Sequence, residues 1–205
     1  FSDNYQGERD NTRNQSADIL DSQNCSFWIV GLAPDVTVND VLDQIKNIGR
    51  VFQVYINEAV GKHPTSAAKL TFFDLEGARR FLAKVQREGG FRVGSHLARV
   101  MRNRIKVAQQ GKRSKGHSRV IKLYGSRVVL HRARIDKVLS GEIKIYNIEF
   151  YEEVEHSVPG EVAITIRFGS YRAQTEGAWK LFNQHFEEDG IRIEYGVDPC
   201  DRVEE

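Results

Sequence analysis

A tryptophan in an apolar strand and a long run of basic residues are the features of this sequence best suited to chemistry. Trp28 lies within the segment 26–32, SFWIVGL. Between Arg79 and Ile135 there are 17 lysines and arginines but a single acid, Glu88, and both flanking parts of the chain are acidic. An exposed ring can stack on a nucleobase, and clustered cations attract a polyanion. The combination favours a nucleic-acid ligand over a solvated basic face.

The elements that must position these residues alternate in a recognisable order. The strand at 27–32 is followed by an amphipathic helix, a strand at 51–56, a strand at 67–73, a second helix and a strand at 97–102. Thr37 to Asp40 has the pattern of a capping box that starts the first helix, which we expect to run to Gly49. The second helix is expected after Asp74, and the segment 89–94 is predicted to be a turn.

This order, and the sequences of the first and third strands, resemble the RNA-recognition motif (RRM) family. The resemblance implies an α+β, ferredoxin-like βαββαβ fold, in which a four-stranded antiparallel sheet is backed by two helices. It also implies binding of single-stranded RNA on the open face of the sheet.

The 205 residues are enough for two such domains. A second glycine-terminated strand, 121–125, suggests an internal duplication. We expect five parts: a disordered or loosely docked tail (1–23), an RRM-like domain (24–107), a basic linker (108–117), a degenerate RRM-like domain (118–200) and an acidic tail (201–205).

Alternation along the strands predicts which residues face the open side of the first sheet. Phe27 and Ile29 are expected to face the helices, whereas Trp28 and Val30 face outward. In the third strand the outward residues are expected to be Ala67, Lys69 and Thr71, and in the second strand Tyr55.

The RRM family usually has aromatic residues where Ala67 and Lys69 stand, so Trp28 alone keeps a stacking position. We therefore predict weak to moderate RNA binding in which electrostatics dominates. Trp28 has an alternative interpretation, as a ring covered by a tail or a partner domain. The predicted RNA-binding residues are Trp28, Val30, Tyr55, Lys69, Arg99, Arg102, Arg104, Lys106, Lys112, Arg113 and Lys115.

The second domain departs further from the family pattern. Its expected elements are strands at 121–125, 147–156, 162–168 and 191–195, and helices at 128–139 and 171–186; the segment 127–131 is alternatively a strand. The open face would carry Lys122, Tyr124, Ala163, Thr165 and Arg167, without an aromatic at the stacking positions. Glutamates at 149, 152, 153 and 155 would repel phosphates. We predict a protein-contact or accessory role for this domain.

The cluster Lys112-Arg113-Ser114-Lys115 has three interpretations: a nuclear-import signal, a phosphate clamp or a solvated spacer. The location is accordingly predicted as nuclear or cytoplasmic. The blocks NCSFWIVGL, TSAAKLTFF, RFGSYRAQ and EYGVDPC also resemble a group of filamentous-fungal RRM proteins, over most of residues 12–200. This resemblance implies a fungal origin and two domains. We also predict a role in mRNA processing.

The remaining patterns argue against other classes of protein. The six histidines lack metal-ligand spacing, no glycine-rich loop follows a strand, and no apolar run is long enough to cross a membrane. Cys25 and Cys200 are too few for a disulfide framework, which favours an intracellular protein. We predict a non-enzyme without cofactor or metal. The alternative function is a protein-interaction scaffold, built on pseudo-RRM domains in an RNA-processing complex, that binds a partner or a second copy.

Overall fold

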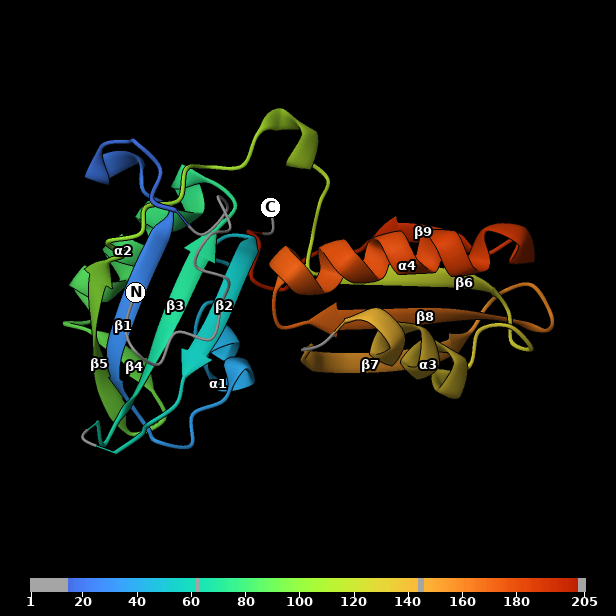
Figure 1. The fold of residues 1–205 in the computed structure, drawn as a ribbon, viewed down its shortest axis with the longest axis horizontal. Coiled ribbons are helices and arrows are strands. Elements are labelled where there is room, and N and C mark those ends of the chain that lie inside the picture. Colours follow the sequence, from blue (N-terminus) through green and yellow to red (C-terminus); the bar gives the residue numbers. More distant parts are fainter. Residues whose placement is uncertain (1–14, 62, 144–145, 203–205) are drawn as a thin grey trace.

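The computed structural model describes residues 15–61, 63–143 and 146–202. The described strands form two antiparallel sheets, with strand orders β2-β3-β1-β5-β4 and β7-β8-β6-β9 (Figure 1). In each sheet the first strand of the domain lies between the third strand and the last long one. This confirms the predicted α+β fold class with two ferredoxin-like βαββαβ units.

The elements of the first domain have boundaries close to those expected. They are β1 (Ser26–Leu32), α1 (Val38–Asp43), β2 (Val51–Asn57), β3 (Ser66–Phe72), α2 (Leu75–Arg87), β4 (Phe91–Val93) and β5 (His96–Arg102).

The first helix begins as predicted and ends early. Thr37 Oγ1 accepts a hydrogen bond from the Asp40 N–H at 3.2 Å, and the Asp40 carboxylate accepts from the Thr37 N–H at 2.8 Å, which is the predicted capping box. The helix ends at Asp43 and not at Gly49. Beyond it the chain makes tighter turns, and Asn47 has a φ of 59°, a left-handed conformation that no α-helix accommodates.

The expected turn at 89–94 contains a short strand. Phe91–Val93 pairs with the start of β5 as a hairpin. Phe91 and Val93 are buried while the residue between them is exposed, and the Phe91 ring lies 5.2 Å from that of Phe81. Burial of these two side chains in the core explains why the segment is a strand.

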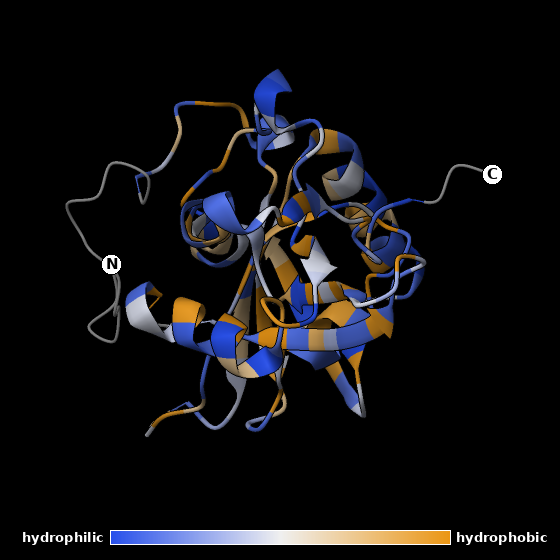
Figure 2. Ribbon diagram, turned by 90° about the vertical axis from the view of Figure 1, so that its right-hand side faces the viewer, coloured by the Kyte–Doolittle hydropathy of each residue, from blue (hydrophilic) through white to orange (hydrophobic). Residues whose placement is uncertain are grey.

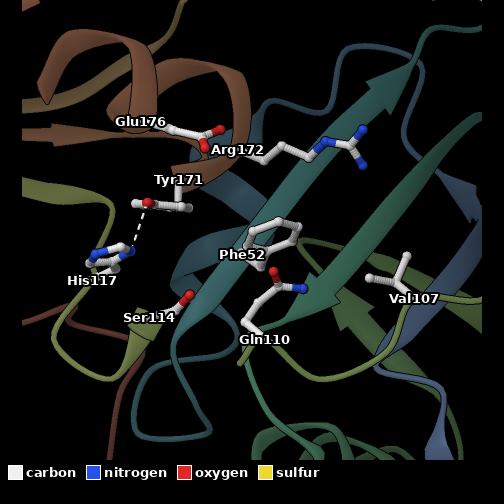
Figure 3. A pocket seen from close by; sticks show the side chains of 8 residues that line it. All are labelled: Phe52, Val107, Gln110, Ser114, His117, Tyr171, Arg172 and Glu176. Atoms are coloured by element: carbon white, nitrogen blue, oxygen red, sulfur yellow. Dashed lines mark hydrogen bonds between the residues drawn. The ribbon is translucent and has the colours of Figure 1, made fainter. Parts of the chain in front are cut away.

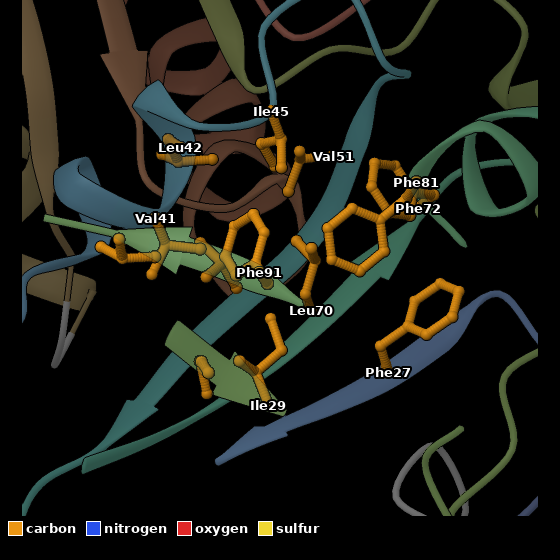
Figure 4. Packing of buried hydrophobic residues seen from close by; sticks show 14 of the residues in the cluster. Phe27, Ile29, Val41, Leu42, Ile45, Val51, Leu70, Phe72, Phe81 and Phe91 are labelled. Atoms are coloured by element: carbon orange, nitrogen blue, oxygen red, sulfur yellow. The ribbon is translucent and has the colours of Figure 1, made fainter. Parts of the chain in front are cut away.

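The predicted faces of β1 are confirmed. Phe27 and Ile29 are fully buried on the helix side, whereas Trp28 and Val30 are partly exposed. Figure 4 shows Phe27 and Ile29 grouped with Leu70 and other large apolar side chains from the strands and helices. Hydrophobic and hydrophilic bands alternate along the strands in Figure 2, as expected for sheets with one buried face.

The second domain repeats the arrangement with one fewer strand. Its elements are β6 (Val120–Ser126), α3 (Arg132–Glu142), β7 (Ile148–Glu155), β8 (Glu161–Phe168), the π-turn η4 (Tyr171–Thr175), α4 (Glu176–Phe186) and β9 (Arg192–Tyr195). Gly31 and Gly125 occupy matching places in β1 and β6, and both have positive φ, at 85° and 155°. Both values lie in the region of φ that favours glycine.

Two predictions for the second domain are wrong in detail. The helix expected at 128–139 begins at Arg132, because the N–H groups of Val129 and Leu130 both bond to the Ser126 carbonyl in a turn; the alternative strand at 127–131 does not form. The helix expected from Tyr171 begins as a helix only at Glu176, after the distorted turn η4.

The chain returns to the first domain after β9. The Gly49 N–H donates to the Cys200 carbonyl at 2.6 Å, and the Val51 N–H donates to Asp198 Oδ2 at 2.9 Å. The Cys200 side chain is buried in the same hydrophobic cluster as Cys25. Residues 198–200, assigned above to the second domain, therefore complete the core of the first.

A buried arginine joins this returning segment to the second domain. Arg119, just before β6, is 1% exposed and donates from Nε to Asp198 Oδ1 at 2.8 Å. Its Nη1 contacts Glu149 and donates to the Phe168 carbonyl at 3.0 Å. A buried guanidinium with this set of acceptors is fully compensated.

A second contact covers part of β2, an edge strand of the first sheet. Ser170 Oγ accepts from the Val54 N–H and donates to the Val54 carbonyl, both at 2.8 Å. The ring of Tyr171 lies 5.9 Å from that of Phe52 and 5.0 Å from that of Phe73. The exposed backbone of an edge strand is thus satisfied by the other domain.

Candidate nucleic-acid interface

The open face of the first sheet brings together several predicted residues. In the register of the sheet, Trp28 lies opposite Lys69 of β3, and Lys69 lies opposite Tyr55 of β2. On the other side Trp28 lies opposite Met101 of β5, and Val30 lies opposite Arg99. Opposed residues of antiparallel strands have Cβ atoms about 4.5–5.5 Å apart, so this row forms one continuous surface.

The surface combines rings with cations. Tyr55 is 44% exposed, Arg99 is exposed, and Trp28 and Lys69 are partly exposed. Burial of the ammonium group, followed by the positive charge of Arg172, lowers the pKa of Lys69 to about 8. A bound phosphate would favour the charged form of this lysine.

A polar network closes one end of the face. Thr71, expected to point outward into solvent, is fully buried and donates to Ser26 Oγ at 2.9 Å. Asn103 Nδ2 also donates to Ser26 Oγ, and Asn24 Nδ2 donates to the Asn103 carbonyl at 2.9 Å. The segments before β1 and after β5 cover this end, so Thr71 offers no RNA contact.

Two of the predicted basic residues have partners within the chain. Arg102 lies opposite Phe27 in the sheet, with its guanidinium 4.7 Å from the Phe27 ring and bonded to the Asn24 carbonyl. Lys106 Nζ bonds to the Ile19 carbonyl at 2.8 Å and pairs with Asp21 at 2.8 Å. Arg102 therefore lies on the opposite face of the sheet from Trp28.

The other predicted basic residues follow β5 and are exposed to solvent: Arg104, Lys112, Arg113 and Lys115. The linker that carries the last three is held in place. Arg50 Nη1 donates to the carbonyls of Ser114, Lys115 and His117 at 3.1, 3.1 and 2.9 Å. The cluster is thus presented by a fixed backbone.

The open face of the second domain carries rings that are covered. The predicted face residues Lys122, Tyr124, Ala163, Thr165 and Arg167 are partly exposed, and the strand residues between them are buried. The Arg192 guanidinium lies 4.2 Å from the Tyr124 ring, and the Arg167 guanidinium lies 3.9 Å from that of Phe150. Stacking of these arginines occupies the ring faces that a base would need.

The glutamates of β7 are divided between the two sides of the sheet. Glu152 lies opposite Thr165 and shares the open face, whereas Glu153 and Glu155 lie opposite the buried Ile164 and Val162. Glu149 is paired with Arg119. The expectation that all four glutamates repel phosphates at one face is therefore wrong for three of them, because alternation and the buried arginine direct them elsewhere.

A cleft of about 300 Å³ lies where the linker and the second domain meet the first sheet (Figure 3). His117 Nδ1 and the Tyr171 hydroxyl are 2.8 Å apart, and the two rings stack at 5.4 Å. The lining residues are Phe52, Val107, Gln110, Ser114, His117, Tyr171, Arg172 and Glu176.

Sequence reasoning missed this cleft. Phe52 falls at an irregularity in the β2–β3 pairing, so strict alternation gives it no face. Tyr171 and Arg172 were assigned to a regular helix. The available signal was the segment Gly169-Ser170, a small pair between a strand and an expected helix, which marks an irregular connection.

Other chemistry finds little support in the part of the chain that the structure describes. Among these residues no group of three or more histidines, cysteines, aspartates or glutamates is placed to hold a metal ion, and no helix has the length and apolarity of a membrane span. Both cysteines are free thiols, and burial raises the pKa of each to about 12, which makes them poor nucleophiles.

Comparison with known proteins gives distant structural likeness. No family profile and no curated protein matches the chain. The first two RRM domains of the yeast poly(U)-binding protein share 11% identity with a TM-score of 0.34, over 84% of this chain and 99% of that one. RRM domains 1 and 2 of Drosophila Sex-lethal share 11% identity with a TM-score of 0.30, over 84% and 100%.

Identities and TM-scores this low say nothing about function. The fold is therefore assigned from the strand order of the chain itself. In both sheets that order, with a helix in each crossover, is the one that the resemblance to the RRM family implied. The chain is therefore an α+β protein with two ferredoxin-like βαββαβ domains in tandem.

Proposed function

We propose that this protein is a non-enzymatic RNA-binding protein whose first domain binds single-stranded RNA on its open sheet face. The observation that carries the proposal is the row Tyr55–Lys69–Trp28 across three adjacent strands, where two rings flank a cation. Rings on a sheet accept bases of any sequence, and cations hold the phosphates. Arg99, which is exposed beside Val30, extends this surface.

The basic residues after β5 supply a second, sequence-independent part of the interaction. Arg104, Lys112, Arg113 and Lys115 are exposed and attract phosphates at long range. Arg102 and Lys106 remain candidates from the sequence, but their bonds within the chain must be broken before they can contact RNA. Binding is expected to be weak to moderate and to fall steeply with salt.

The test is a titration of fluorescent single-stranded RNA, followed by anisotropy at two salt concentrations. Trp28→Ala should weaken binding by roughly 1–3 kcal/mol and leave the salt slope unchanged, because stacking releases no counterions. Arg99→Ala should reduce the slope by about 0.7, the share of one phosphate contact on a single strand. Tyr124→Ala, which removes a covered ring from the second sheet, is the matched control and should bind normally.

Two results would count against the proposal. Absence of binding tighter than about 100 μM at low salt would remove RNA as the ligand, because non-specific binding usually reaches that level. Equal binding by Trp28→Ala and the wild type, with both folded, would move the site away from the sheet face.

A scaffold function is the second candidate, favoured by the covered rings and Glu152 on the second sheet face. In this function the second domain contacts a partner protein or a second copy, within an RNA-processing complex. A doubled mass in light scattering would support self-association, and a monomer at all concentrations would exclude it.

We propose that the protein acts inside the cell, in the nucleus or in the cytoplasm. The fixed, exposed cluster Lys112, Arg113 and Lys115 is suited to recognition by an import receptor. The test replaces Lys112, Arg113 and Lys115 with alanine in a fluorescent fusion. If the fusion stays nuclear, the cluster is not the import signal.

A further inference from the structure

The short strand β4 gives the first sheet a fifth strand that has no counterpart in the described part of the second sheet. It forms a hairpin with the start of β5, in which Val93 pairs with His96 across the loop Gly94-Ser95. Gly94 has a φ of 59°, a left-handed conformation that favours glycine and suits two-residue loops. The hairpin is therefore a tight, regular extension of the sheet.

Two buried side chains fix the faces of β4. Phe91 is fully buried and Val93 is 4% exposed, and both belong to the hydrophobic core on the helix side. Because successive residues of a strand point to opposite faces, Arg92 between them lies on the open face. Arg92 is exposed, and within the described residues its guanidinium has no hydrogen bond or ion pair.

The register of the sheet connects Arg92 to the face that carries Trp28. Arg92 lies opposite Leu97 of β5. Leu97 shares its face of β5 with Arg99 and Met101, because alternate residues of a strand lie on one face. Met101 in turn lies opposite Trp28. The open face of the first domain thus continues without interruption onto the hairpin.

The ring and the two arginines form a diagonal line across this face. With strands about 4.8 Å apart and a rise of about 3.3 Å per residue, each step from Trp28 to Arg99 and from Arg99 to Arg92 spans about 8 Å, in the same direction. The Arg99 guanidinium is held against Met101, with Nη2 3.4 Å from the sulfur. Evenly spaced cations that follow a ring match a nucleic-acid strand, in which phosphates recur at regular intervals beside a stacked base.

Leu97 adds an exposed apolar side chain beside Arg92. It is 52% exposed, although it is a large hydrophobic residue in a regular strand. Its position depends on Gly90, because a Cβ at residue 90 would lie 2.7 Å from Leu97 Cδ1. Leu97 and Arg92 together therefore offer an apolar and a cationic group to one ligand.

The charges on the two sheet faces differ in the same sense. In the first sheet the strand residues that register places on the open face include Lys69, Arg99 and Arg92 but no carboxylate. The open face of the second sheet carries Glu152 and Glu194. Cations without nearby acids attract a polyanion, so the hairpin extends the face that is suited to RNA.

We propose that the β4–β5 hairpin extends the RNA site of the first domain. In this arrangement the RNA strand runs from Trp28 past Arg99 to Arg92. Arg92 binds a backbone phosphate, and Leu97 packs against the adjoining nucleotide. This inference rests on the proposed RNA binding of the first domain.

The test compares two RNA lengths by fluorescence anisotropy. Arg92→Ala should weaken binding of a single-stranded RNA of about ten nucleotides about tenfold and reduce its salt slope by about 0.7, as expected for one charged phosphate contact. Arg92→Lys keeps the charge and should restore the slope. An RNA of about four nucleotides, little more than the two or three bases that such a sheet stacks, should bind Arg92→Ala and the wild type within about twofold.

Arg79→Ala is the matched control. Arg79 is exposed on α2, on the helix side of the same domain, so its removal changes the net charge equally without touching the open face. Its effect on either RNA should be less than about twofold, because exposed charges far from the RNA are screened by salt. Thermal unfolding shows whether each variant is folded. If Arg92→Ala is not, Arg92→Gln replaces it in the same comparison.

Methyl NMR gives a second readout at the hairpin. The Leu97 methyl resonances should shift when the longer RNA is added to the wild type, and this shift should be smaller in Arg92→Ala. Val128, which is 85% exposed in the second domain, is the control methyl and should not shift.

The outcomes separate the two proposals. If Trp28→Ala weakens binding of the longer RNA but Arg92→Ala behaves like Arg79→Ala, the extension is wrong and the sheet-face site stands. Arg92 would then only protect the edge strand against pairing with another sheet. Leu97 resonances that do not move with the longer RNA would also overturn the extension. If the wild type binds neither RNA, the proposed function fails, and the inference with it.

Discussion

Replacing Arg119 with methionine tests how strongly the two domains depend on each other. The guanidinium is 1% exposed and holds Asp198, which is itself fully buried and accepts from the Val51 N–H of the first domain. Methionine keeps much of the volume and removes the charge. Asp198 and Glu149 would then lie close together without their cation.

Breaking a buried ion pair by removing one partner typically costs about 3–5 kcal/mol, because it leaves an uncompensated charge in the interior. For a chain of this size, 1 kcal/mol shifts Tm by about 2–4 °C. We therefore expect Arg119→Met to lower Tm by about 6–20 °C in calorimetry. We also expect one unfolding transition for the wild type and two for the variant, because the segment that completes the first domain's core would detach.

The matched control is Arg127→Met, which removes an exposed pair. Arg127 lies 3.1 Å from Glu155, with side chains 53% and 85% exposed, so its loss should cost about 0–1 kcal/mol. A loss by Arg119→Met no larger than that of the control would refute the reasoning. It would mean that water reaches Asp198 and that the returning segment does not hold the domains together.

Three further predictions concern the junction and the open face of the first sheet. Ser170→Ala should lower the free energy of unfolding in urea by about 1–3 kcal/mol, because the Val54 N–H and carbonyl lose their partner in a buried place. An unchanged value would mean that water replaces the hydroxyl. Stability should rise between pH 8 and pH 10.5 relative to Lys69→Met, because the unfolded chain keeps a lysine proton that the folded chain releases from about pH 8 upward. RNA affinity should decline over the same pH range, because Lys69 loses its positive charge. Lys69→Arg should flatten this decline, because arginine stays charged. An equal decline in both proteins would show that Lys69 does not contact the phosphates.

Local patterns predicted the elements that depend on local contacts. Alternation placed Phe27 and Ile29 in the core and Trp28 on the open face, because a half-buried strand requires period-two burial. Thr37 and Asp74 marked two helix starts, because the side chain of each accepts a hydrogen bond from the N–H three residues ahead.

Contacts between distant segments explain what was missed. Near Tyr171 only the small pair Gly169-Ser170 hints at an irregular connection; the break itself follows from the bonds of Ser170 to Val54, 116 residues away. Arg119 lies within the basic run 79–135, whose charge favoured a polyanion ligand, yet its charge is neutralised by Asp198 and Glu149. Net charge along a sequence does not distinguish a surface cation from one that holds two domains together.

These long-range contacts also bear on the role of the second domain. Its sheet face offers no free ring at Tyr124 or Phe150, so a direct base contact there requires Arg192 or Arg167 to move. Its turn 170–173, in contrast, already lies against β2 through the bonds of Ser170 to Val54. Binding that uses preformed geometry loses less conformational entropy than binding that must first displace side chains. The two domains therefore meet through preformed contacts, and the sheet face of the second domain is the part that would have to rearrange to bind RNA.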